Sequence, residues 1–219
     1  MRHFIALAAI PALIACADSQ PRVETETPEP ATAVASEVET AEAFDFSELS
    51  DGTYTEDDGH AYIMFSYLHQ GYSRPILRWS EFDATVDFDA DAPENSTLNV
   101  TIPVASIDSM VPAFNDHLKS GDFFEAETYP MITFQSTSLD IDPDGTGTIT
   151  GDLTIKDVTQ SITLDGKLNK IGENRSGADM FGISGTGTLK RSDFNVGAYV
   201  PNVGDEVSLM IEVEFQKAE

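Results

Sequence analysis

An alternation of apolar and polar residues runs through the chain from Gly52 onward, and it constrains the fold more than any other feature. Near the C-terminal end, apolar side chains occupy every second position from Val207 to Phe215. Similar alternation occurs in residues 82–88, 98–102, 149–155 and 162–168. Successive side chains of a strand point to opposite faces of a sheet. These segments are therefore predicted to be half-buried antiparallel strands.

Turn-forming residues separate the predicted strands. They lie at 91–95, 142–145, 157–160, 172–174 and 201–205. Clusters of Gly, Pro, Asn and Asp between alternating segments mark turns. The pattern predicts an all-β domain of about eight strands, a number that favours a closed barrel wide enough to hold one small ligand. Periodicity alone also allows a two-layered β-sandwich.

Residues 111–121 do not alternate and are predicted to form a short helix. Pro112 suits the first turn, where its missing N–H costs nothing. Gly121 suits the position after the helix end, where φ can be positive. The apolar pair Phe123 and Phe124 follows directly. A helix and two aromatic side chains beside a run of strands indicate a lid on a β-structure.

Several motifs extend this pattern from about Tyr54 to about Phe215. They are His117-Leu118-Lys119-Ser120, Asp122-Phe123-Phe124-Glu125, Ile132-Thr133-Phe134, Gly151-Asp152-Leu153-Thr154-Ile155 and Arg191-Ser192-Asp193-Phe194. In order and spacing they resemble the YceI-like family of bacterial periplasmic proteins. The resemblance implies an eight-stranded antiparallel, lipocalin-like barrel with one short helix, which holds a long isoprenoid or similar lipid. Family members often carry Arg-Asp where this chain has Phe114-Asn115, and the change makes the lid more apolar.

Residues 1–15 are predicted to be a secretory signal peptide. Their apolar stretch is too short to span a bilayer, which needs roughly 20 residues. The stretch ends in Leu13-Ile14-Ala15-Cys16, which resembles the lipobox of bacterial lipoproteins, where the cysteine becomes the lipidated first residue. Cys16 is the only cysteine in the chain. A stray cysteine in an ordinary signal peptide is the alternative.

Residues 16–49 are rich in Pro, Thr, Ala and Glu and are predicted to be a disordered acidic linker. The barrel domain is expected over 50–219. The formal net charge of −26 argues against a nucleic-acid partner, because such binding depends on Lys and Arg. The sequence thus predicts an exported protein whose lipid anchor at Cys16 attaches it to a membrane of the bacterial cell envelope. The domain would face the periplasm, and a protein partner cannot be named.

Five glycines fall in phase with the apolar residues of their own strands: Gly147, Gly151, Gly166, Gly185 and Gly187. Glycine removes side-chain volume from the face that should fill the core. The set predicts either space for a ligand or bends and bulges of the barrel, and both explanations remain open.

Two polar side chains are expected to point inward. His69 follows the apolar phase of its strand, and Arg78 shares the phase of Phe82. A buried Arg or His needs partners. The partner would be either the polar head of a lipid or a structural group of the protein itself.

Neither a metal site nor a catalytic site is predicted. His60, His69 and His117 are spaced too irregularly for a local metal motif. The chain has no Gly-x-Ser-x-Gly motif and no thiol beyond Cys16.

The predicted function is non-catalytic binding, sequestration or transport of a long apolar lipid in the bacterial envelope. An isoprenoid, a quinone or a polyprenyl lipid would fit, and no cofactor is expected apart from that lipid. The alternatives are an envelope interaction scaffold with a filled barrel core and a lipid-modifying enzyme. The predicted ligand-binding residues are His69, Arg78, Phe82, Phe114, His117, Leu118, Phe123, Phe124, Phe134, Gly151, Gly166 and Gly185.

Overall fold

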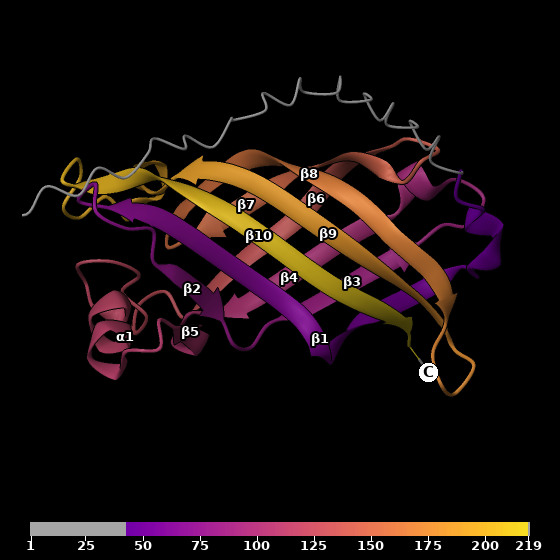
Figure 1. The fold of residues 1–219 in the computed structure, drawn as a ribbon, viewed down its shortest axis with the longest axis horizontal. Helices are drawn as coiled ribbons and strands as arrows, with labels where there is room; N and C mark the ends of the chain where they lie inside the picture. Colours follow the sequence, from indigo (N-terminus) through magenta and orange to yellow (C-terminus); the bar gives the residue numbers. More distant parts are fainter. Residues whose placement is uncertain (1–42, 219) are drawn as a thin grey trace, which may run out of the picture. The chain divides into compact units, whose positions relative to one another are not determined.

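The alternating segments form an antiparallel sheet that closes on itself as a barrel of eight long strands (Figure 1). The sheet closes where the last strand pairs with the first, so that Ile63 lies opposite Ile211. The strands of the ring are β1 (Gly52–His69), β3 (Asp83–Phe88), β4 (Thr97–Pro103), β6 (Met131–Ile141), β7 (Thr146–Ile155), β8 (Val158–Glu173), β9 (Asp179–Lys190) and β10 (Val203–Lys217). Closure pairs the edges that an open sheet would leave exposed. The predicted barrel is confirmed.

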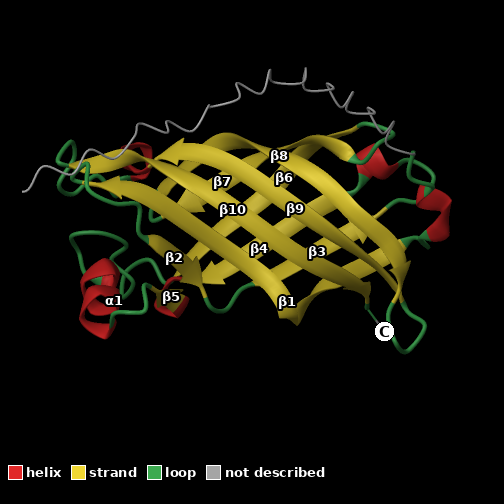
Figure 2. Cartoon of the chain, in the orientation of Figure 1, coloured by secondary structure: helices red, strands yellow, loops and turns green. Residues whose placement is uncertain are grey.

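Short elements gather at one end of the barrel, on the left in Figure 1. There β2 (Ile76–Trp79) pairs with the second half of β1, and β5 (Ile107–Asp108) pairs with β2. The one α-helix among the described residues, α1 (Pro112–Lys119), follows β5. Strands otherwise dominate, with short 3₁₀ turns between them (Figure 2). These turns are η1 (Phe46–Glu48), η2 (Pro93–Asn95), η3 (Val104–Ser106) and η4 (Arg191–Phe194).

Helix α1 begins as predicted, with Pro112 in its first turn. Its end differs from the prediction, because Ser120 caps the helix in an extended conformation and Gly121 does not adopt a positive φ. The backbone N–H of Ser120 donates to the carbonyl of His117 at 3.1 Å. A positive φ comes four residues after Gly121, at Glu125, where the N–H donates to the carbonyl of Ser120 at 2.9 Å. This turn folds the Phe123–Phe124 pair back under the helix.

An aromatic cluster fills the barrel at the end opposite α1. The ring of Tyr54 is fully buried and lies 5.3 Å from the ring of Phe181. Phe215 stacks on Phe181 at 5.2 Å, and Phe88 packs edge-on against Tyr54 at 5.9 Å. Aromatic pairs at such separations add to the stabilisation from burial. We call Tyr54, Phe88, Phe181 and Phe215 the floor of the barrel.

The ordered domain begins before residue 50, earlier than predicted. The backbone N–H of Phe44 donates to the carbonyl of Pro143 at 2.9 Å, and Leu49 is buried in the core. Phe44 and Phe46 pack against the same core. The last residues of the predicted linker therefore belong to the barrel, because they carry Phe and Leu side chains, which residues 17–43 lack.

The computed structural model describes residues 43–218. The predicted signal peptide, Cys16 and the linker up to residue 42 lie outside the described residues. Within the described part of the chain, no helix has the length and apolar character to cross a membrane.

Candidate functional site

The barrel encloses a cavity of about 680 Å³ between the floor and α1. Ligand sites in proteins typically measure about 300–1,000 Å³. All eight strands of the ring contribute lining residues, and most of these are aliphatic or aromatic. The cavity is therefore an apolar binding space inside the barrel.

The alternation of the strands produces the apolar wall. On β1 and β10, Phe65 lies opposite Leu209 and Ile63 lies opposite Ile211, and all four residues line the cavity. Their neighbours in the sequence point to the outer face, because the side-chain period of a strand is two. The same pattern that predicted the strands thus also builds the wall.

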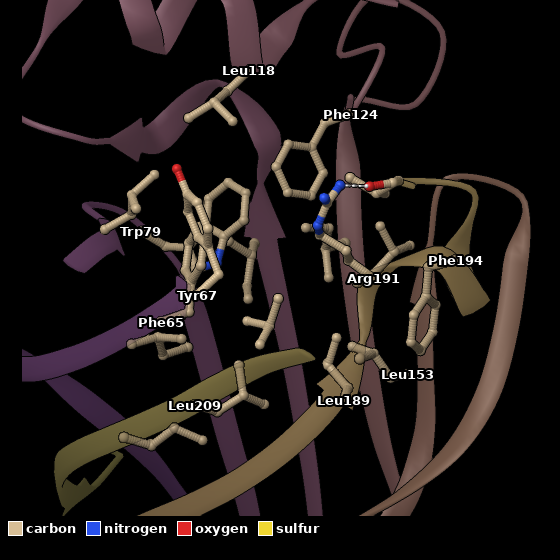
Figure 3. Close-up of a pocket in the computed structure, with 18 of the residues that line it drawn as sticks. Phe65, Tyr67, Trp79, Leu118, Phe124, Leu153, Leu189, Arg191, Phe194 and Leu209 are labelled. Carbon is tan, nitrogen blue, oxygen red and sulfur yellow. Dashed lines mark hydrogen bonds between the residues drawn. The ribbon is translucent and has the colours of Figure 1, made fainter. Parts of the chain in front are cut away.

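Three aromatic side chains meet in the wall at the α1 end of the cavity (Figure 3). The ring of Trp79 stacks on Phe65 at 5.7 Å, and Phe124 meets Trp79 edge-on at 5.3 Å. Both Trp79 and Phe124 are buried, and both line the cavity. These rings belong to the packed core and also form a surface that a ligand would touch.

The cavity reaches the molecular surface beside α1. Tyr199 lines the cavity and is 54% exposed to solvent. Ile76 and Val111 also line the cavity and are exposed to a similar extent. The Tyr199 ring lies 6.2 Å from the ring of His117 and 6.0 Å from that of Phe123. These five residues form what we call the mouth of the cavity, and they bring α1 together with the loop before β10.

Most of the predicted ligand-binding residues lie around this cavity. His69, Phe82, Phe114, His117, Leu118, Phe123, Phe124 and Phe134 all line it. His117 is also hydrogen-bonded through Nε2 to the Asp122 carboxylate at 3.1 Å. The structure thus brings these eight residues together, and their contact with a ligand stays a prediction.

Arg78 does not line the cavity, so its predicted inward orientation is wrong. Its side chain is 53% exposed, and Nε donates to Oδ2 of Asp108 at 3.1 Å. Two hydrogen bonds lower the pKa of the Asp108 carboxyl. The larger effect comes from the backbone N–H of Met110 and the smaller one from Arg78. The prediction assumed that Arg78 shares the phase of Phe82, but the chain breaks between β2 and β3. The break changes the phase, and Leu77 and Trp79 are the inward residues of β2.

The three predicted cavity glycines do not line the main cavity, and this part of the prediction is wrong. A Cβ atom on Gly151 would lie 2.4 Å from Cζ of Phe134, and one on Gly185 would lie 3.3 Å from Cβ of Ile211. These glycines therefore make room for neighbouring side chains and not for a ligand. Gly166 lines a separate cavity of about 110 Å³.

The sequence interpretation missed Tyr67, Trp79 and Arg191 as site residues. Arg191 lines the cavity and is only 8% exposed. Burial lowers the pKa of its guanidinium, and burial likewise raises the pKa of the Tyr67 phenol. Tyr67 lies two positions after Phe65 and shares its inward phase, so alternation could have identified it as a site residue. Arg191 was visible only as part of a family motif.

A separate cluster on the outer surface contains Asp57, His60 and Glu214. A wide bulge in β1, between Glu56 and Ala61, places Nδ1 of His60 3.0 Å from Oδ2 of Asp57 and 3.8 Å from Oε2 of Glu214. The hydrogen bond to Asp57 is the largest cause that raises the pKa of His60. The two carboxylates stabilise the protonated imidazole as an ion-pair partner.

Comparison with known proteins agrees with this geometry. A family model described as the YceI-like domain matches residues 54–215. Protein YceI from Escherichia coli O17:K52:H18 is 38% identical over 155 residues, which is 71% of this chain and 81% of that protein.

Solved structures show the same fold. BcnA of Burkholderia cenocepacia has a TM-score of 0.66 at 27% identity, over 73% of this chain and 98% of BcnA. A polyisoprenoid binding domain from Saccharophagus degradans, implicated in plant cell wall breakdown, has a TM-score of 0.59 at 9% identity, over 77% of this chain and 100% of that domain. The family match covers the strands, the floor and the cavity wall described above, and this protein belongs to the YceI-like family.

Proposed function

We propose that this protein binds a long apolar lipid of the isoprenoid, quinone or polyprenyl type and sequesters or carries it. The observation that carries the proposal is the apolar cavity of about 680 Å³, which has an aromatic floor at one end and a mouth at the other. A closed end and an open end suit a chain-like molecule that enters along the barrel axis. A scaffold with a filled core would have no such cavity.

The energetics favour a long chain over a small solute. Each buried methylene contributes about 0.8 kcal/mol, so a chain of roughly twenty carbons gains about 16 kcal/mol. Association costs about 4–15 kcal/mol in lost freedom. A short apolar molecule would gain too little from this wall to remain bound.

The cavity lining favours binding over catalysis. Among the residues that line it, none is Asp, Glu, Lys or Cys. Carboxylates and thiols are the usual acids, bases and nucleophiles beside His and Ser. Ser109 lines the cavity, but its hydroxyl donates a hydrogen bond to Oδ1 of Asn115 in α1 at 2.5 Å. This hydroxyl therefore has a structural partner. This lining supports a non-catalytic role.

The relatives support the same class of ligand. The Saccharophagus domain is named for polyisoprenoid binding, and it shares the fold with this chain. We further propose that the chain is exported and anchored through a lipidated Cys16, with the barrel facing the periplasm. That part of the proposal rests on the predicted signal peptide and lipobox.

Mass spectrometry of the organic extract from purified protein tests the proposal. We expect an isoprenoid-type lipid at about one molecule per chain. Ala84→Phe projects a ring into the cavity and should abolish the lipid, because Ala84 lines the wall. Thr85→Phe is the matched control, since the next side chain of β3 points to the other face. Extracts without lipid from the wild type, or equal lipid in both variants, would contradict the proposal.

A further inference from the structure

An unpartnered phenol group lies in the mostly apolar cavity wall. Tyr67 lines the cavity and is 9% exposed. Its hydroxyl forms no hydrogen bond with any residue of the described range 43–218. Among residues 43–218 no fully enclosed side-chain N or O atom lacks a partner, so the Tyr67 hydroxyl faces the open space of the cavity. In a cavity that receives a ligand, such a group is available to bind it.

Arg191 offers a second donor in the same wall. A guanidinium has five N–H groups, and four of those on Arg191 donate to backbone carbonyls. These acceptors are Gly204 at 2.8 Å, Val196 at 2.6 Å, Ala198 at 2.8 Å and Val203 at 3.0 Å. The Nη2 atom makes only one of these bonds, so one of its hydrogens has no acceptor within the described residues.

The charge of Arg191 is not neutralised by direct contact. No carboxylate of the described residues lies within 4.0 Å of its guanidinium. Burial is the largest influence on the pKa of Arg191, and the charge of Asp205 opposes it. The two carboxylate oxygens of Asp205 accept hydrogen bonds from the N–H and the hydroxyl of Ser192 at 2.9 and 2.8 Å. Arg191 therefore places a positive charge in the same cavity wall as Tyr67.

Both donors lie near the α1 end of the cavity. On β1, Tyr67 is one inward position closer to that end than Phe65, and Figure 3 shows Tyr67 and Arg191 on the side of Leu118 and Phe124. Ile63 and its partner Ile211 continue the apolar wall toward the floor. A ligand with one polar end would place that end here and its chain along the barrel.

We propose that Tyr67 and Arg191 form a polar subsite for the acceptor oxygens of a lipid head, and that the lipid enters tail first. The inference rests on the proposed lipid binding and specifies the chemistry of the head. A quinone has two carbonyl oxygens and a phosphate has several, so either head offers an acceptor to each of the two groups and gains from the charge of Arg191. An amine head repels the guanidinium and leaves its free N–H unpaired.

The test uses Tyr67→Phe, which keeps the ring and removes the hydroxyl. Arg191 is unsuitable because its four carbonyl bonds order residues 196–204, and its loss would disturb the loop. The ligands are a quinone, a phosphate and an amine that carry the same geranylgeranyl tail, with squalene as a hydrocarbon that has no head. Affinities are measured by calorimetry on lipid-free protein. Tyr62→Phe, on the exposed face of β1, is the matched control.

We expect the wild type to bind the quinone and the phosphate more tightly than the amine. Tyr67→Phe should weaken the quinone and the phosphate up to about tenfold, as expected for one lost hydrogen bond. Squalene should bind both proteins equally, and Tyr62→Phe should change nothing. If the phosphate bound more tightly than the quinone, the charge of Arg191 would be the larger contribution to affinity within the same subsite.

Two results would overturn the inference. Equal affinity for all heads, with no effect of Tyr67→Phe, would remove the subsite and leave lipid binding intact. Failure of every ligand, squalene included, would overturn the proposed function and the subsite with it.

Discussion

Phe124 contributes to the packed core and to the ligand wall at once. Its ring is buried edge-on against Trp79 at 5.3 Å, and it also lines the cavity. Phe124→Ala should lower the free energy of unfolding by about 3–5 kcal/mol, the usual loss for a buried Phe. Chemical denaturation of lipid-free protein measures this.

Phe123 provides the matched comparison, because it lies at the mouth and is only partly buried. Phe123→Ala should cost less stability and should speed release of a bound lipid. If Phe124→Ala changed neither stability nor ligand release, its place in the core would be refuted.

His60 should titrate above its ordinary pKa of 6.5. Its hydrogen bond to Asp57 is the largest cause, and the charge of Glu214 adds to it. Because the folded pKa is raised, the pair contributes its full stability below pH 6.5 and loses it as pH rises through the raised value. NMR titration of the imidazole checks this.

Asp57→Ala should move the pKa of His60 back toward 6.5 by more than Glu214→Gln does. Glu214→Gln is the control that leaves the bulge hydrogen bond from the Gly59 N–H to Asp57 in place. An unshifted His60 in the wild type would contradict the geometry of the bulge.

At the scale of the strands, two glycines on neighbouring strands should respond in opposite ways. On β7, a methyl group at Gly151 would overlap the Phe134 ring at 2.4 Å, so Gly151→Ala should cost about 1–3 kcal/mol through overpacking. On β8, the nearest atoms to a methyl group at Gly166 lie 3.8 Å away. Gly166→Ala should be neutral or stabilise by up to about 1 kcal/mol. Thermal unfolding of both variants measures the difference, and equal effects would contradict the packing described.

The elements also show which features the sequence could predict. Alternation identifies strands and their inward faces, because the period of two is a property of the backbone, and it correctly placed Phe82 in the wall. It failed at Arg78, since nothing in the pattern shows that the chain breaks between β2 and β3 and changes phase.

The glycines and Arg191 show a second limit. A sequence shows that a side chain is missing at Gly151, but it does not show that Phe134 fills the space. The partners of Arg191 are carbonyls of a loop without periodicity, so no side-chain pattern reveals them. Sites that depend on loop backbone need the three-dimensional structure.

At the scale of the whole molecule, the predicted anchor can be tested without reference to the barrel. Cys16→Ser should abolish acylation and release the protein from the membrane fraction, because multiple acyl chains on one residue account for stable attachment. Fractionation and the mass of the mature protein measure this. The same mass and the same membrane fraction in the variant would refute the lipobox interpretation.

Trp79 gives the most direct test of binding inside the barrel. It is the only tryptophan of the chain, and it lines the cavity with 7% exposure. Titration of lipid-free protein with a long isoprenoid alcohol should change its emission saturably at one molecule per chain, and Ala84→Phe should abolish the change. Emission that does not saturate, or that responds equally in Ala84→Phe, would contradict a ligand inside the barrel.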